Sequence, residues 1–334
     1  MRIAVIGSGA IGGLVAGYLK QAGEDVVLVG RSSSVEAIRK NGLNISGPRG
    51  SFNIKIDVFE KLGQKVDLAI LAAKTQDLED SIKSNLEFIR EALILTAQNG
   101  IRADNIASRY INKTSIISSI VMFGSTSVKP AEIVHNFEGS WVIGKAFSRN
   151  DDEVIQIGAV LNNIFPTIVV EDIMGMKYLK IFVNANNCIA AILGASMQEA
   201  FSDIEISKIS IGIWKEGMEA IKKAGVELVS LPDFPLERLN KLVAMPTTDA
   251  AKIFSGIMAN LSKEPLYGSI LQSIKKGRKS EIDYINGEFV NIAKNSSTDA
   301  PLNKKLVEMV HKVEETGKFF SKEELLSHTK GLYN

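Results

Sequence analysis

The chain has almost none of the residue type that cross-links proteins. Its 334 residues include one cysteine, Cys188. A single thiol forms no internal disulfide and leaves no cysteine cluster for a structural zinc ion. Proteins without disulfides are typical of reducing compartments. We therefore expect a cytoplasmic protein without a metal site.

The chain also lacks an excess of charge and a long apolar run. Lys and Arg number 39 and Asp and Glu 38, so the formal net charge is +1. This balance gives no electrostatic footprint for nucleic acid or an anionic membrane. No stretch reaches the roughly 18 uninterrupted apolar residues of a membrane span. The N-terminal run MRIAVIGSGAIGG could resemble a secretory signal, but its glycines have another explanation. We expect neither nucleic acid nor membrane as a partner.

The length fits two domains, and the first half alternates strands with helices. RIAVI (2–6), a glycine turn, a helical pattern and DVVLVG (25–30) form a βαβ unit. Alternating strands and helices predict a mostly parallel sheet covered on both faces. Further strands are predicted at 52–59, 66–73, 92–97 and 115–123, with a helix at 75–92.

The pattern changes after residue 130. Residues 131–145 look like a hairpin that turns at Glu138 and Gly139, and 150–165 read as a helix with an Asn or Asp cap. After TIVVED (167–172) the chain is almost entirely helical in period. We therefore predict an α/β domain at 1–168, with a Rossmann-type doubly wound sheet, and an all-α domain at 169–334.

A glycine motif follows the first strand and opens the first helix. Gly7, Gly9 and Gly12 form G-x-G-x-x-G, with Ser8, Ala10 and Ile11 between them. The first glycine permits the tight turn, the second lets a pyrophosphate approach the backbone, and the third permits close helix packing. The motif predicts a nicotinamide or flavin dinucleotide. A glycine-rich turn without a ligand is the alternative.

Three strand ends carry further candidates. NAD-selective sites usually have Asp or Glu at the end of the second strand, but here Arg31 follows it. A guanidinium suits a 2′-phosphate, so NADP(H) is favoured over the alternative of a solvent-exposed arginine. Lys74 and Asn99 follow two later strands, where ligands bind in such sheets. Such residues are also common turn formers.

The run YLKIFVNANNC (178–188) carries polar residues in a pattern typical of a buried helix. Lys180 and Asn184 lie one turn apart on the same face. Apolar residues surround Lys180, whereas Lys177 fits a solvent-facing position. A buried ammonium tends toward a lowered pKa, which is the condition for a general acid near neutral pH.

A second polar cluster lies at 267–290. Gly277 indicates a helix end, and Ser280 with Asp283 reads as a capping pair for the next helix. This places Glu281 in the first turn of that helix. There it could act in a site or merely complement the helix dipole.

Together these motifs resemble the ketopantoate reductase family, across the whole chain. The resemblance rests on GSGAIG, Arg31, Lys74, QNG at 98–100, the segment with His135, K-x-x-x-N at Lys180, S-x-L-Q at Ser269 and GRKSEIDYING at 277–287. The family reduces 2-dehydropantoate to pantoate with NADPH on the way to coenzyme A. It implies a Rossmann domain followed by a helical domain.

The resemblance also implies roles for individual residues. Lys180 looks like the family's general acid, and Glu281 like its acidic partner, which helps to hold substrate and cofactor. Ser269 would bind the carboxylate of the substrate, and Asn184 would bind its hydroxyl end. Lys74 and Asn99 would lie at the cofactor and the substrate. The implied partners are NADPH, a small 2-oxo acid and a possible second copy in a homodimer; His135 is assigned a structural role.

The sequence departs from the family pattern near the substrate. The family usually has a second asparagine where this chain has Cys188, a proline where it has Ile189, and an asparagine where it has Leu266. Losing a buried hydrogen-bond partner costs about 1 to 3 kcal/mol. Either a carboxamide takes over or the substrate is a different 2-oxo acid; the candidates are Asn186, Asn187 and Gln198. A paralogous reductase and a non-catalytic NADP(H) sensor are the two alternative functions.

Overall fold

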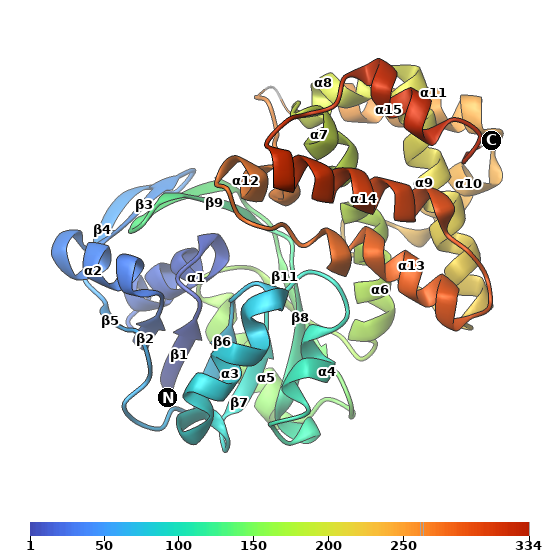
Figure 1. The fold of residues 1–334 in the computed structure, drawn as a ribbon. Coiled ribbons are helices and arrows are strands. Elements are labelled where there is room, and N and C mark those ends of the chain that lie inside the picture. The colour runs from blue at the N-terminus through green and yellow to red at the C-terminus, as the bar shows by residue number, and fades with distance from the viewer. Residues whose placement is uncertain (261, 263, 334) are drawn as a thin grey trace. The chain divides into compact units, whose positions relative to one another are not determined.

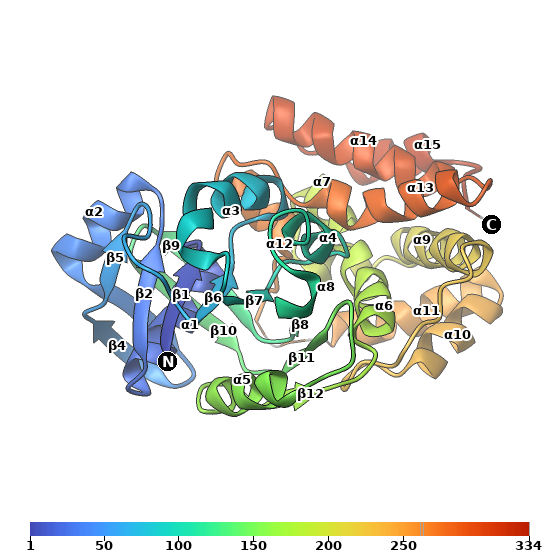
Figure 2. The same ribbon diagram turned by 90° about the horizontal axis from the view of Figure 1, so that it is seen from below.

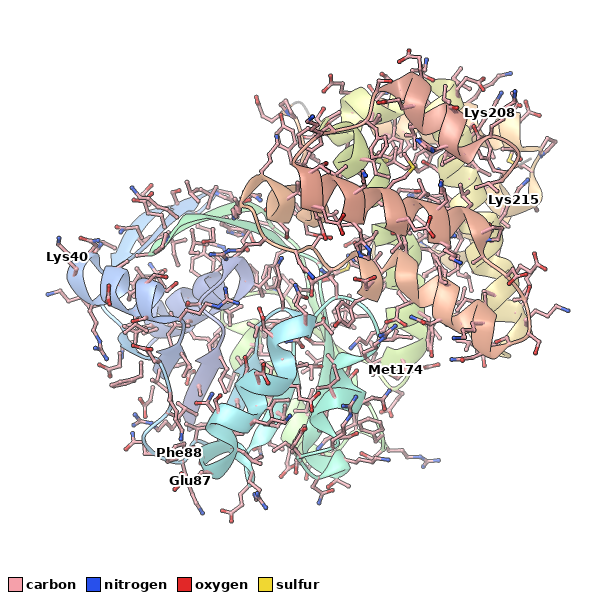
Figure 3. All side chains as sticks on the ribbon, in the orientation of Figure 1. Lys40, Glu87, Phe88, Met174, Lys208 and Lys215 are labelled. Carbon is pink, nitrogen blue, oxygen red and sulfur yellow. The ribbon has the colours of Figure 1, made fainter. Side chains whose placement is uncertain are left out.

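The structure, a computed structural model, describes residues 1–260, 262 and 264–333. The chain divides into two compact units, Met1–Met174 and Gly175–Asn334. Met174 is labelled in Figure 3. The boundary predicted near residue 168 falls inside a strand of the first unit, six residues before this division. No helix among the described residues is long and apolar enough to cross a membrane.

The first unit is built on an eight-stranded sheet, which confirms the predicted Rossmann-type fold (Figure 1). Its order is β12-β11-β8-β7-β6-β1-β2-β5. Six neighbouring strands, β8 to β5, are parallel, and β11 runs antiparallel to β8. The bounds are β1 (Arg2–Ile6), β2 (Asp25–Val29), β5 (Asp57–Phe59), β6 (Leu68–Leu71), β7 (Leu93–Thr96), β8 (Ile116–Val121), β11 (Trp141–Lys145) and β12 (Thr167–Val169).

Helices cover both faces of this sheet because its strands are apolar on both sides (Figure 2). One face packs on α1 (Ala10–Gln21), α2 (Ser32–Asn41) and α5 (Asp152–Asn162). The opposite face packs on α3 (Thr75–Ile89) and α4 (Ala103–Ala107), with the turn η1 (Lys113–Ser115) before β8. The predicted cap of the 150–165 helix is confirmed, since the Asp151 carboxylate accepts from Val154 N.

A second sheet of order β4-β3-β10-β9 corrects two predictions. The single strand predicted at 52–59 is two strands, because β4 (Gly50–Ile54) pairs with β3 (Leu43–Gly47) while β5 pairs with β2. The hairpin predicted at 131–145 is also wrong. Its two halves, β10 (Glu132–Phe137) and β11, belong to different sheets, and β10 instead forms a hairpin with β9 (Gly124–Lys129).

The second unit is helical in its described residues, as predicted. Its helices are α6 (Ile173–Ala185, which begins in the first unit), α7 (Asn187–Leu193), α8 (Met197–Phe201), α9 (Ile204–Lys223), α10 (Leu236–Ala244), α11 (Thr247–Ala259), α12 (Ser269–Lys275), η2 (Ile282–Tyr284), α13 (Asn286–Asn295), α14 (Pro301–Thr316) and α15 (Lys322–Thr329). The long helix α9, which carries the labelled Lys208 and Lys215 in Figure 3, packs against α10, α11, α13 and α14.

Helix α6 is fixed in the second unit by a hydrogen bond and by aromatic packing. The Trp214 indole on α9 donates to the Phe182 carbonyl at 2.8 Å. The Phe182 ring lies 4.7 Å from the Phe289 ring of α13. A Cβ at Gly217 would stand 2.8 Å from Phe289 and 3.0 Å from Phe182, so only glycine lets α9 approach both rings. This packing sets the rotation of α6 about its axis.

A buried polar network joins four helices of the second unit. The Glu216 carboxylate on α9 accepts from Leu302 N and Asn303 N at 2.7 and 2.9 Å, which caps the N-terminus of α14. Burial raises the pKa of Glu216, and these hydrogen bonds oppose the shift. The Asn303 amide donates to the same carboxylate, and Asn286 on α13 donates to Asn303. Beyond Asn286 lies Cys188 of α7.

A second network surrounds His135 in the first unit. The ring is 1% exposed and lies between the Tyr18 hydroxyl, at 2.9 Å, and the Phe137 carbonyl, at 3.0 Å. Burial lowers the pKa of His135. Arg49 forms two hydrogen bonds of 2.7 Å to Glu138, donates to the Ile164 carbonyl and stacks on Tyr18. Both ring nitrogens of His135 therefore have partners within the fold, without a ligand.

We predict that Arg49→Met lowers the free energy of unfolding by about 1 to 2 kcal/mol, because Glu138 and the Ile164 carbonyl lose their donor. Urea unfolding measures the change. The matched control is Lys65→Met, whose pair with Glu91 is 69% and 75% exposed and which should change stability by less than about 0.5 kcal/mol. Equal effects of the two variants would contradict the prediction.

Candidate active site

The glycine turn after β1 has the geometry of a nucleotide-binding loop. Gly7 has φ of 119°, and a Cβ there would stand 2.5 Å from Ala73 N. A Cβ at Gly12 would stand 1.8 Å from the Gly7 carbonyl oxygen. Gly9, the N-cap of α1, instead faces open space, with no atom within 4 Å of a built Cβ. Gly7 and Gly12 therefore permit close packing of the turn against its neighbours, whereas Gly9 leaves open space beside the backbone.

The topology places this turn where ligands bind in open parallel sheets. From β1 the chain proceeds to β2 and β5 on one side and then crosses to β6 on the other. Such a switch point forms a crevice at the carboxyl ends of the strands. Arg31 and Lys74 are the N-caps of α2 and α3, the helices that follow β2 and β6. Both predicted residues thus lie at the edge that carries Gly9.

Asn99 lies at the same edge, after β7. The preceding residue, Gln98, is 7% exposed, and its Nε2 donates to the carbonyls of Leu71 and Ala73 at 2.8 and 2.9 Å. Those two donations identify which terminal atom of the carboxamide is the nitrogen, so the other atom is Oε1, an acceptor. Oε1 is buried without a partner among the described residues. Gln98 therefore ties the end of β7 to the loop that carries Lys74.

The residues at this edge fit a dinucleotide. The N-terminus of α1 offers backbone N–H groups and a positive dipole to a pyrophosphate, and the space at Gly9 admits it. The unpartnered Gln98 Oε1 offers an acceptor to a ligand hydroxyl or amide. The predicted residues Ser8, Ala10 and Ile11 complete the turn, and Ser8 packs on Gly30, where a Cβ would stand 2.2 Å from its Oγ.

Lys180 lies on α6, within the second unit. Burial lowers the pKa of its ammonium to about 8, and the negative charge of Asp233 opposes the shift. Asn184 follows one turn later on the same helix. The expectation that Lys177 faces solvent is wrong, since this residue is 2% exposed. The helix is covered on more sides than its sequence pattern indicates.

The run NANNC divides at a break between α6 and α7. Asn186 lies between the two helices, is 2% exposed, and has an Oδ1 without a partner among the described residues. Cys188 is fully buried, and burial raises the pKa of its thiol to about 12, with the Asn286 carboxamide opposing. Cys188 therefore faces the polar network of α13 and α14.

Of the three carboxamides that could replace a missing asparagine, Gln198 is committed elsewhere. Its Nε2 donates to the carbonyls of Ser262 and Glu264, and its Oε1 accepts from Leu266 N at 3.0 Å. Asn187 is partly exposed and packs on Gly268, where a Cβ would stand 2.9 Å from its Cγ. Gly268 precedes Ser269, so Asn187 lies beside the start of α12.

Ser269 and Glu281 are placed differently from each other. Ser269 is the exposed first residue of α12. This helix ends just before Gly277, as predicted, and Gly277 has a left-handed backbone conformation. Glu281 is partly buried and is the N-cap of the short 3₁₀ turn η2, not a residue of a helix's first turn. The predicted Ser280–Asp283 capping pair is wrong, because the N-cap of this turn is Glu281 and not Ser280. The Asp283 carboxylate contacts His311 at 3.1 Å.

Two acidic residues beside the candidates were missed from the sequence. Asp233, in the segment LPDFP (231–235), acts on Lys180. Asp77, in the first turn of α3, pairs with Arg31 at 2.9 Å. Neither contact is local in sequence, so no spacing pattern reveals it. Among the described residues, no group of three His, Cys, Asp or Glu could hold a metal ion.

Comparisons with known proteins agree with these motifs. The model of "Ketopantoate reductase PanE/ApbA" matches residues 3–147, and that of its C-terminal domain matches residues 172–314. The 2-dehydropantoate 2-reductase of Pyrococcus horikoshii is 31% identical over 323 residues, which cover 95% of this chain and 99% of the relative. The chain belongs to the ketopantoate reductase family. The Archaeoglobus fulgidus 2-dehydropantoate 2-reductase is 24% identical, over 94% of this chain and 98% of the relative.

Solved structures share the fold of this ketopantoate reductase family member. D-mandelate dehydrogenase with NADH and anilino(oxo)acetate has a TM-score of 0.83 at 23% identity, over 95% of this chain and 99% of that one. A ketopantoate reductase from Ralstonia eutropha has a TM-score of 0.79 at 20% identity, over 94% and 99% of the two chains. At these identities the likeness concerns the fold alone.

We predict that Lys180→Met raises the free energy of unfolding by about 3 kcal/mol near pH 7, because a pKa lowered from 10.5 to about 8 means that folding disfavours the ammonium. The folded pKa is below the unfolded one. The gain should thus be full below pH 8 and vanish above pH 10.5. Urea unfolding at several pH values tests this, with Lys252→Met, 61% exposed, as control. A gain that grew with pH would contradict it.

Proposed function

We propose that the protein is an NADPH-dependent 2-oxo acid reductase that converts 2-dehydropantoate to pantoate, for pantothenate and coenzyme A synthesis in the cytoplasm. The observation that carries the proposal is Lys180, an ammonium whose pKa burial lowers to about 8, on the helix that also carries Asn184. The names of the relatives from Pyrococcus horikoshii and Archaeoglobus fulgidus support the substrate.

In the proposed reaction Lys180 is the general acid. The bound nicotinamide supplies a hydride to C2 of the keto acid. Lys180 donates a proton to the keto oxygen as negative charge develops there, becomes a neutral amine, and regains its proton from solvent. A pKa of about 8 leaves the ammonium mostly protonated at pH 7 yet makes it a stronger acid than an exposed lysine. Ser269 binds the substrate carboxylate, and Asn184 and Glu281 hold the substrate.

The cofactor proposal rests on the edge of the sheet in the first unit. The glycine turn and the N-terminus of α1 hold the pyrophosphate, and Arg31 and Lys74 provide cations for phosphate groups. Asn99 contacts the nicotinamide riboside. D-mandelate dehydrogenase, of the same fold, was solved with NADH, so NADH is the competing nucleotide against which NADPH is compared.

A paralogous reductase of another 2-oxo acid is the second candidate. The observation that favours it is Cys188, which is fully buried beside Asn286 where the family usually has an asparagine. Asn187, beside the start of α12, is the accessible carboxamide that could compensate. A sensor that binds NADP(H) without turnover would need no buried ammonium, so Lys180 disfavours it. A homodimer stays a prediction.

We predict that Lys180→Ala lowers kcat by about 10² to 10⁴, the contribution of a general acid, while the Kd of NADPH changes little. Steady-state kinetics and a nucleotide titration measure the two quantities. Lys252→Ala, on the exposed face of α11, is the control. Full activity of the Lys180 variant would remove the assignment of the acid.

The rate of keto acid reduction should fall as pH rises through about 8, because the reaction needs the protonated Lys180. Oxidation of the alcohol needs the neutral amine, so its rate should rise over the same range. Initial rates in both directions from pH 6 to 10 test this. Parallel profiles in the two directions would contradict the role of Lys180.

A panel of 2-oxo acids assayed by loss of NADPH absorbance separates the candidate functions. We expect 2-dehydropantoate to exceed phenylglyoxylate and pyruvate in kcat/KM by orders of magnitude. Preference for another acid would support the paralogue. Binding of NADPH without turnover of any acid would support the sensor.

A further inference from the structure

The Arg31–Asp77 ion pair joins two loops that approach from opposite sides of β1. Arg31 follows β2, and Asp77 lies in the first turn of α3, which follows β6. In the sheet, β1 lies between β2 and β6. Arg31 Nη2 nevertheless lies 2.9 Å from Asp77 Oδ2. The pair therefore connects the two sides of the switch-point crevice whose middle strand carries the glycine turn.

Arg31 is thus engaged before any ligand arrives, and other carboxylates lie near it. The adjacent Ser32 hydroxyl contacts Glu60 at 3.0 Å and Glu36 at 3.3 Å. Arg31 and Asp77 are 69% and 45% exposed, so water and a ligand can reach both. A 2′-phosphate near Arg31 would meet a guanidinium that is already neutralised.

We propose that Asp77 is a cofactor-selectivity residue that competes with the 2′-phosphate of NADP(H) for Arg31. The inference rests on the NADP(H) binding proposed above. A phosphate carries close to two negative charges and accepts two hydrogen bonds from a guanidinium, so it displaces one exposed carboxylate. Asp77 then remains as an unpaired negative charge beside the phosphate. NAD(H) has no such group, and Arg31 keeps Asp77. Asp77 therefore narrows the preference for NADPH over NADH.

The test compares Asp77→Asn with Asp80→Asn, which removes the same charge from an exposed position one turn along α3. Titrations of NADPH and NADH without substrate, by nucleotide fluorescence or calorimetry, give two Kd values for each protein. Exposed ion pairs contribute little, so Asp77→Asn should tighten NADPH about two- to fivefold and leave NADH nearly unchanged. Asp80→Asn should alter neither.

Two further arms separate competition from a general charge effect. The first arm repeats Asp77→Asn in a protein that already carries Arg31→Met. There the substitution should no longer change the ratio of the NADPH and NADH Kd values by the factor that it causes in the wild-type protein. In about 1 M salt, where charges are screened within about 3 Å, the gain should shrink. Both arms use the intact chain and need no catalytic turnover.

The outcomes distinguish this inference from the proposed function. If NADPH binds and Asp77→Asn leaves the ratio unchanged or weakens NADPH, the competition is refuted while the proposed function stands. A gain that persists unchanged in Arg31→Met also refutes it. If the wild-type protein binds neither nucleotide, both the proposed function and the inference fail.

Discussion

The burial of one ammonium group, that of Lys180, is the constraint on which the proposed chemistry depends. Lys180 lies on a helix that Trp214, Phe182 and Gly217 fix against α9 and α13. Burial of the ammonium on that helix lowers the pKa of Lys180 to about 8. The position of Lys180 on α6 therefore disfavours the charge that the proposed reaction needs. Asp233 offsets part of this penalty, so the site depends on a balance between burial and one carboxylate.

Several buried polar groups find partners within the fold. Glu216 caps α14 and holds Asn303, which holds Asn286, so one carboxylate organises several helix contacts. Arg49 does the same in the first unit for Glu138 and the Ile164 carbonyl. Gln98 Oε1 and Asn186 Oδ1 are among the buried atoms that have no partner in the described part of the chain. Both belong to segments that carry candidate site residues.

The sequence predicted the elements whose partners are close in the chain. β1, the glycine turn, α1 and β2 were found because strand, turn and helix signals follow one another within a few residues. The segment 52–59 was misread because its two halves pair with different strands, and the segment 131–145 because its two halves belong to different sheets. Local alternation does not record which strand or sheet a segment joins. The site divides likewise: Arg31 and Lys180 were found from their own surroundings, whereas Asp77 and Asp233 act across the fold. Lys177 was misplaced because both sides of α6 are covered.

The break after α6 has a consequence for how this protein can be observed. Its sole thiol, Cys188, is the second residue of α7, the helix that follows the one carrying Lys180. The thiol is fully buried and has a pKa raised to about 12. A thiol reagent reacts with the thiolate, so it can reach Cys188 only when this segment opens. The rate of labelling thus measures local opening of the helix pair that carries Lys180, and the native chain contains its own reporter of motion there.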